Sequence, residues 1–254
     1  MDIIVNANAE KMPANAKPLK KEGNYFSNIL ACLGFDETHF PLAHFLALYY
    51  GFQGNNWLLA SPIHWEASHN DAMITNLVLL DETASKKHFK EISAFLNEIP
   101  MFYISADKWL FNIDNCPPIK SVILTKVLSQ SLMPIISNWD KDLYWQRVFT
   151  EIQMFLNQSN SFSQLNGLWF WGEGQFSLSS QRRILTDDHK LIALEPFITK
   201  LDETSKLNKK DLLILKNEDS LMLFNLLDKA KKHQTNWYWN NFSYSLGRFR
   251  WWLW

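Results

Sequence analysis

The segment "HWEASHND" (64–71) contains the residues whose types and spacing best suit metal chemistry. It carries two imidazoles and two carboxylates, those of His64, Glu66, His69 and Asp71. Residues at positions i and i+2 share one face of a strand, so His64 and Glu66 would point the same way. Carboxylates and imidazoles of this kind hold the two cations of phosphotransfer sites, which lie about 3.5–4 Å apart.

The rest of the sequence does not supply the further ligands that a two-metal site needs. The His64–His69 spacing fits no common zinc pattern, and "TDDHK" (186–190) is typical of a solvated loop. The nucleophile motif Gly-x-Ser-x-Gly and the glycine-rich phosphate loops do not occur in the sequence. We therefore expect solvated or hydrogen-bonded loop residues at 64–71, with no catalytic residue, metal or cofactor; a divergent metal site is the alternative.

The stretch "GLWFWGEGQF" (167–176) places tryptophans directly beside a glycine turn. Trp169 and Trp171 would share one face of a strand and the residue between them would take the other, which predicts a strand buried on both faces. The alternative is a small-molecule or peptide cleft, because ligands bind at strand ends in α/β sheets. The candidate residues of that cleft are Asn166, Trp169, Trp171, Gly172 and Gly174.

The C-terminal stretch "NWYWNNFSYSLGRFRWWLW" (236–254) combines tryptophan with arginine, the residue types that dominate binding hot spots. A last strand completing the sheet would bury some of these rings. Neighbouring residues on a strand alternate sides, so the final tryptophans cannot all point inward. An interface with a partner protein is the second interpretation, and its candidate residues are Trp237, Trp239, Arg248, Arg250, Trp251, Trp252 and Trp254.

Composition narrows the class of protein. The formal net charge is -1 and no basic face stands out, which argues against a nucleic-acid partner. No apolar run approaches the roughly 20 residues of a membrane helix, and the N-terminus does not resemble a signal peptide. The two cysteines, Cys32 and Cys116, are expected to be reduced packing residues. These features predict a cytoplasmic protein. A place at the periphery of a membrane-bound assembly is a further expectation, which goes with the adaptor hypothesis below.

Hydrophobic periodicity predicts strands alternating with helices. Strands are expected at 2–7, at 56–67 with a break at Pro62, at 76–81, in a hairpin over 101–114 and near 212. Helices are expected from Tyr25, over 41–51, after residue 81, over 142–158 and over 220–234. This order predicts α/β, or α+β, with a mixed sheet flanked by helices. We expect a single domain, 1–254, and the polar segment 202–211 would be the boundary of any subdivision into 1–200 and 212–254.

Four blocks carry a family resemblance: "NWLLASPIHWEASHNDAMI" (56–74), "DKWLFNID" (107–114), "YWQRVFTEIQMFLNQS" (144–159) and "LNGLWFWGEG" (165–174). In this order they resemble the "DPVHLRAD", "RWYL", "NEIQMLLHEHPVN" and "NSLWFWGGG" blocks of bacterial phosphoglycerate mutase-like, RpfE-type regulatory proteins. The resemblance implies a reduced phosphoglycerate mutase/alkaline phosphatase-like α/β sandwich. Enzymes of that fold use a Ser or Thr nucleophile beside two metals.

The chain departs from that family at the positions where an inherited site would lie. Ser61 replaces the aspartate of "DPVH", "NQSNS" (157–161) replaces "EHPVN", and Glu173 interrupts the three-glycine turn. The first functional hypothesis is therefore a non-catalytic adaptor with protein partners. Length and a Lys/Asn/Phe-rich composition fit an accessory subunit of a type IV secretion coupling complex. The alternatives are a metal-dependent phosphohydrolase or mutase and a ligand-sensing regulatory protein.

Overall fold

The computed structural model describes residues 1–9, 17–18, 25–67, 71–128, 130–159, 164–178, 182–194, 198–230 and 232–246. The chain divides into two compact units: unit 1 comprises Met1–Glu37 and Ser177–Trp254, and unit 2 comprises Thr38–Phe176. Unit 1 is thus built from both ends of the chain. The division does not fall in the polar segment 202–211, and the expectation of a single domain 1–254 stays a prediction.

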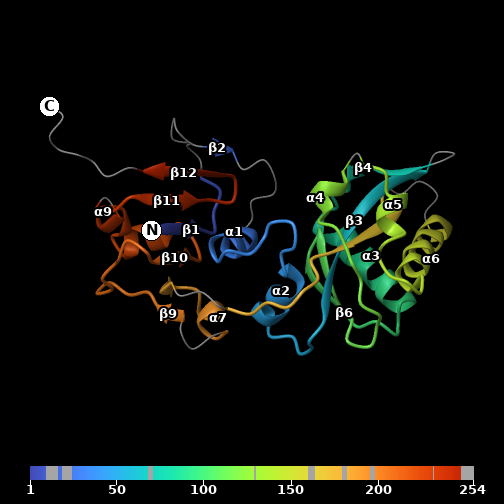
Figure 1. Cartoon of the computed structure of the whole chain (residues 1–254), viewed down its shortest axis with the longest axis horizontal. Coiled ribbons are helices and arrows are strands. Elements are labelled where there is room, and N and C mark those ends of the chain that lie inside the picture. Colours follow the sequence, from blue (N-terminus) through green and yellow to red (C-terminus); the bar gives the residue numbers. More distant parts are fainter. Residues whose placement is uncertain are drawn as a thin grey trace. The chain divides into compact units, whose positions relative to one another are not determined.

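Unit 1 contains a mixed sheet of seven strands in the order β2-β12-β11-β1-β10-β8-β9 (Figure 1). The strands are β1 (Asp2–Val5), β2 (Lys17–Pro18), β8 (Ile184–Thr186), β9 (Ile198–Lys200), β10 (Leu212–Leu215), β11 (Thr235–Tyr238) and β12 (Phe242–Leu246). β1 pairs in parallel with both β10 and β11, whereas β12 runs antiparallel to β11. The uninterrupted apolar runs of β1 and β10 suit strands that are covered on both faces.

Short helices flank this sheet: α1 (Tyr25–Cys32), α7 (His189–Ile192), α8 (Asp219–Leu223) and α9 (Leu226–Ala230). The predicted α/β class, with a mixed sheet flanked by helices, is confirmed. The single helix predicted over 220–234 is wrong. The chain breaks between α8 and α9, where Asn225 has a φ of 49°, a left-handed conformation that asparagine tolerates and a continuing helix excludes.

Unit 2 is organised by an antiparallel five-stranded sheet around its longest strand, β3. The strands are β3 (Trp57–Ala67), β4 (Ala72–Leu77), β5 (Met101–Ser105), β6 (Lys108–Asn112) and β7 (Gly167–Trp171). Ile63 pairs with both Leu77 of β4 and Gly167 of β7, so these two strands lie on opposite edges of β3. The hairpin predicted over 101–114 is confirmed as β5 and β6.

β3 continues through Pro62, which corrects the predicted break. The Ile63 carbonyl accepts a hydrogen bond from the Asn166 N–H at 3.2 Å, so Ile63 faces β7 and the neighbouring Pro62 faces the other edge. On that edge β6 pairs only as far as Ala60, and β4 begins at Ile63. The missing N–H of proline therefore removes no ladder bond.

The helices of unit 2 are α2 (Leu42–Tyr50), α3 (Glu82–Phe95), α4 (Leu124–Val127), α5 (Met133–Ile136) and α6 (Tyr144–Ser159). α3 begins after Asp81, whose side chain accepts a hydrogen bond from the Ala84 N–H at 2.8 Å, as an N-cap does. The strand predicted at 76–81 is displaced, because β4 covers 72–77 and residues 78–80 lead into α3. Within the described parts of the chain, none of the helices has the length and apolar character that a membrane span requires.

Candidate functional site

The predicted metal ligands at 64–71 are held by protein contacts. His64 donates from Nδ1 to the Gln164 carbonyl at 2.7 Å, and its Nε2 lies 3.8 Å from Oε1 of Glu66. Asp71 accepts hydrogen bonds from the Ala72 N–H and the Ser131 hydroxyl, and His69 lies outside the described residues. The described residues include no group of three or more His, Cys, Asp or Glu placed to hold a metal ion.

The strand before the glycine turn belongs to the core. All five residues of β7 are buried, as predicted for a strand covered on both faces. The Trp169 indole N–H donates to the Val122 carbonyl at 2.8 Å, and the Trp171 indole N–H donates to the Ser61 hydroxyl at 3.0 Å. Both tryptophans thus bury their rings and satisfy their polar atoms at once.

Helix α2 fixes the turn that follows. Gly172 and Gly174 have φ values of 81° and 113°, which only glycine adopts readily. The Ala43 N–H donates to the Gly172 carbonyl at 3.0 Å, and the Phe176 N–H donates to Nδ1 of His44 at 2.8 Å. The beginning of α2 therefore positions the turn from both sides.

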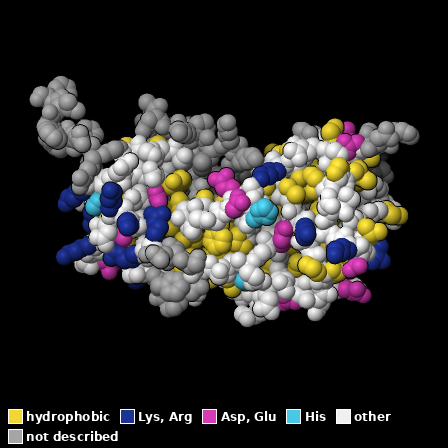
Figure 2. All heavy atoms as spheres, viewed as in Figure 1, with side chains coloured by type: hydrophobic (Ala, Val, Ile, Leu, Met, Phe, Trp, Pro, Cys, Tyr) yellow, Lys and Arg dark blue, Asp and Glu magenta, His cyan; other side chains and the backbone are white. Residues whose placement is uncertain are grey.

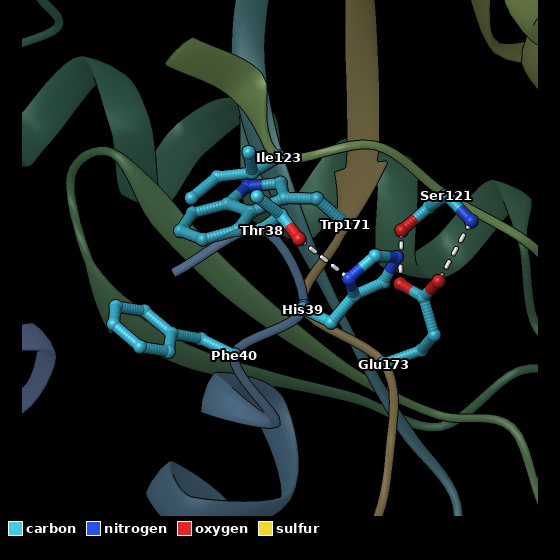
Figure 3. A pocket seen from close by; sticks show the side chains of 8 residues that line it. Thr38, His39, Phe40, Ser121, Ile123, Trp171 and Glu173 are labelled. Atoms are coloured by element: carbon cyan, nitrogen blue, oxygen red, sulfur yellow. Dashed lines mark hydrogen bonds between the residues drawn. The ribbon is translucent and has the colours of Figure 1, made fainter. Parts of the chain in front are cut away.

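Glu173 lies in a small hollow beside this turn (Figure 3). Its carboxylate accepts hydrogen bonds from the backbone N–H and the hydroxyl of Ser121. The His39 imidazole lines the same hollow, and its Nδ1 is hydrogen-bonded to the Thr38 hydroxyl at 2.6 Å. A carboxylate, an imidazole and a hydroxyl could exchange protons. The hollow has a volume of only about 10 Å³, which is room for one water molecule and no substrate.

A second hollow, of about 250 Å³, lies beside Gly174 and is mainly apolar. Trp57, Ile113, Cys116 and Ile119 line it, and Glu173 is also part of its wall. Burial raises the pKa of the Cys116 thiol, so this sulfur stays protonated and is a poor nucleophile at neutral pH. The volume is slightly below the range of about 300–1,000 Å³ typical of ligand sites.

The five predicted cleft residues therefore separate into two groups. Trp171 and Gly172 line the first hollow, and Gly174 lines the second. Asn166 instead joins strand ends, because it accepts from the Trp65 N–H at 2.9 Å and donates to the Trp65 carbonyl at 2.7 Å. Trp169 is fully buried in the core.

His44 makes the stability of this region depend on pH. Burial lowers the pKa of His44 below its usual 6.5, against the opposing influence of Asp114. The contribution of neutral His44 to the free energy of unfolding is therefore fully present above about pH 6.5. It decreases as the pH falls toward the lower pKa of the folded state. Protonation would also remove the acceptor that Phe176 uses.

We expect the free energy of unfolding of the wild type to decrease between about pH 7.5 and pH 5.5, with a smaller decrease in His44→Gln. Glutamine keeps an acceptor but does not titrate. His44→Ala should cost about 1–3 kcal/mol at neutral pH, since the Phe176 N–H would lose its partner. Urea titrations at several pH values measure both effects, and identical pH profiles for wild type and His44→Gln would contradict this role.

The predicted C-terminal interface is only partly within the described residues. Trp237 and Trp239 are buried in the core of unit 1, and Trp237 stacks on Tyr244 with ring centroids 5.9 Å apart. These two rings therefore offer no surface to a partner. The other five predicted residues, Arg248, Arg250, Trp251, Trp252 and Trp254, lie outside the described residues.

The segment "TDDHK" (186–190) is not the solvated loop that the sequence indicated. Asp188 is fully buried, accepts a hydrogen bond from the Tyr25 hydroxyl at 3.1 Å and caps α7 through the Lys190 N–H. Asp187 accepts from the Lys216 N–H at 2.8 Å and from the Ser220 hydroxyl. These carboxylates join the ends of β8 and β10 and the beginning of α8.

An exposed apolar surface on α8 and α9 was not predicted from the sequence. Met222, Leu223 and Leu227 are 78%, 63% and 49% exposed, whereas Leu221 and Leu226 of the same helices are buried. Residues 221–227, "LMLFNLL", are apolar except for Asn225, so this run does not indicate which of its residues face water. We call Met222, Leu223 and Leu227 the α8–α9 surface.

Comparisons with known proteins show no family. No protein-family model matches the chain, and no curated protein matches its sequence. Among solved structures, the chain is similar to a cofactor-independent phosphoglycerate mutase from Thermoplasma acidophilum, with a TM-score of 0.35 and 11% identity. That alignment covers 97% of this chain and 90% of the mutase. A similarity at this level does not establish a shared fold or activity.

Proposed function

We propose that the chain is a non-catalytic interaction protein, an adaptor or accessory subunit of a multiprotein assembly. The observation that supports this most is the α8–α9 surface, where Met222 and Leu223 are adjacent and Leu227 follows on the neighbouring helix. Exposed single apolar residues are ordinary, but clusters of large ones mark interaction sites. Methionine suits such a surface, because its flexible thioether adapts to varied partners.

The packing of the two helices supports a preformed surface. Leu226 and Ala230, spaced i and i+4, are buried and attach α9 to the core of unit 1. Leu221 does the same for α8. With these positions fixed, a partner would meet an ordered apolar surface and would lose less conformational entropy on binding.

The finer identity of the assembly is part of this proposal. From its length and its Lys/Asn/Phe-rich composition, we propose that the chain is an accessory subunit of the DotZ kind, in a bacterial type IV secretion coupling complex. An adaptor of that kind would act in the cytoplasm, next to a membrane-bound assembly. The terminal residues Arg248, Arg250, Trp251, Trp252 and Trp254 would add a second contact of hot-spot composition.

A second candidate function is ligand sensing at the glycine turn, which the apolar hollow of about 250 Å³ favours. Recovery of the chain without protein partners would point to this function.

The α8–α9 surface can be tested by substitution. We expect Met222→Ser/Leu223→Ser to lower the recovery of native partners at least tenfold, since central apolar contacts contribute about 2 kcal/mol or more to binding. Tagged variants expressed in the native host, with quantitative mass spectrometry of the co-purified proteins, measure this. The matched control is Met133→Ser/Met154→Ser, which changes two exposed methionines of unit 2. Equal recovery by wild type and the Met222/Leu223 variant would overturn the proposal.

A further inference from the structure

A basic groove lies next to the α8–α9 surface in unit 1. Its hollow has a volume of about 310 Å³ and is lined by the loop 203–207 on one side and by Lys229, Lys232 and His233 on the other. Lys206 belongs to the loop, so three lysines meet in the groove. Among the described residues that line it, Glu203 is the one carboxylate. Lys and Arg side chains also gather on the face of unit 1 at the left of Figure 2.

The lysine charges are not neutralised by neighbouring acids. Among the described residues, no ion pair joins Lys206, Lys229 or Lys232 to a carboxylate. The Lys229 ammonium donates to the carbonyl of Glu203 at 2.7 Å, which holds the loop against α9. The lining of the groove therefore carries three lysines against the single carboxylate of Glu203, an excess of positive charge.

The Asp202 carboxylate next to this loop is directed to its own turn and not to the lysines of the groove. This carboxylate accepts hydrogen bonds from the hydroxyl of Thr204 at 2.8 Å and from the hydroxyl of Ser205 at 2.9 Å. It is thus hydrogen-bonded to its own turn, and Asp202 is absent from the lining of the groove.

Helix α9 joins the groove to the α8–α9 surface. The buried residues Leu226 and Ala230 define its inner face, and Leu227 and Lys229 lie on either flank of that face. A helix is only about 10–12 Å across with its side chains. One short segment of a partner can therefore reach both the apolar flank and the basic flank.

We propose that this groove binds an acidic, amphipathic segment of a partner protein, whose apolar side chains contact Met222, Leu223 and Leu227. The inference rests on the proposed adaptor function and specifies the chemistry of its partner. A nucleic acid would suit the lysines but not the apolar flank. A peptide with leucines on one face and carboxylates on the other satisfies both flanks, and the charge complementarity also speeds association.

The probe for this proposal is a fluorescein-labelled leucine/glutamate peptide of about 18 residues, long enough to form a helix. Anisotropy titrations of the full chain should show at least tenfold tighter binding than for the same peptide with glutamine in place of glutamate. Binding should weaken as salt is raised. Equal affinity for the two peptides, or tighter binding of a single-stranded oligonucleotide of similar length, would overturn the proposal.

Charge reversal within the chain provides the matched comparison. Lys206→Glu/Lys232→Glu should reduce peptide affinity at least tenfold, and Lys126→Glu/Lys141→Glu in unit 2, which changes the net charge equally, should not. Neither Lys206 nor Lys232 uses its ammonium in a hydrogen bond to the described residues, and Lys126 and Lys141 are exposed, so both double variants should fold. An equal loss of peptide affinity in the two double variants would refute binding of the peptide in the groove. If the groove proposal is wrong but the adaptor function is right, Met222→Ser/Leu223→Ser still lowers the recovery of partners. If the adaptor function itself is wrong, this variant recovers the same proteins as the wild type.

Discussion

Replacement of Trp169 by alanine should lower the free energy of unfolding by about 3–5 kcal/mol, the usual cost of truncating a buried tryptophan. The ring is fully buried on β7, and its centroid lies 5.1 Å from that of Trp139. The indole N–H also satisfies the Val122 carbonyl. Chemical denaturation followed by circular dichroism measures the loss, because the substitution removes both packing and a buried hydrogen bond.

Phenylalanine substitutions separate the packing of the ring from its hydrogen bond. Trp139 is buried to the same degree as Trp169, but its indole N–H has no hydrogen-bond partner among the described residues. Trp169→Phe should therefore cost about 1 kcal/mol more than Trp139→Phe, since only the former leaves a carbonyl unpaired. Equal costs for the two phenylalanine variants would show that the hydrogen bond from Trp169 to the Val122 carbonyl does not stabilise the protein.

Gly54→Ala should lower the free energy of unfolding by about 3 kcal/mol, combining steric overlap with backbone strain. Gly54 has a φ of 146°, and a Cβ there would lie 2.3 Å from Nδ2 of Asn112. The Asn112 side chain cannot move without cost, because it donates to the Gln53 carbonyl and accepts from the Asp114 N–H. The substitution would also disturb the wall of the apolar hollow next to Trp57.

Gly51→Ala is the matched control for that substitution. Gly51 ends α2 with a φ of 77°, but no atom lies within 4 Å of its added Cβ. It should cost only the backbone strain, about 1–2 kcal/mol. Thermal or urea unfolding of both variants gives the steric contribution at Gly54 as a difference. A Gly54→Ala protein no less stable than Gly51→Ala would contradict the packing described for this turn.

The sequence predicted those elements whose signals are local. The apolar runs of β1 and β10 and the buried β7 are where they were expected. The long helices α3 and α6 were found through their amphipathic spacing. Gly51 correctly marked the end of α2, and Gly172 correctly marked the end of β7. Both glycines have positive φ values, which other residues adopt less readily.

Features that depend on distant partners could not be predicted. Unit 1 joins the two ends of the chain, which no local pattern reveals. Pro62 is tolerated only because β4 and β6 leave a gap opposite it. The burial of Asp188 depends on the Tyr25 hydroxyl, 163 residues away in sequence.

The candidate site was predicted less well than the fold for the same reason. The tryptophans that suggested an interface, Trp237 and Trp239, are core residues, because their rings belong to the buried cluster that also contains Leu221 of α8 and Leu226 and Ala230 of α9. The α8–α9 surface, in contrast, lies in the run 221–227, which is apolar except for Asn225. Its exposed positions are set by the break at Asn225 and by the attachment of Leu226 to the core.

The central claim, that partners bind the α8–α9 surface, is tested most directly by oxidative footprinting of the methionines. Met222 is 78% exposed, and Met133 and Met154, at 55% and 56%, serve as internal controls in unit 2. Brief hydroxyl-radical exposure of the chain alone and of its co-purified complex, followed by mass spectrometry, compares the three side chains. We predict that the complex protects Met222 while oxidation of Met133 and Met154 is unchanged. Equal oxidation of Met222 in the free chain and in the complex would contradict the claim.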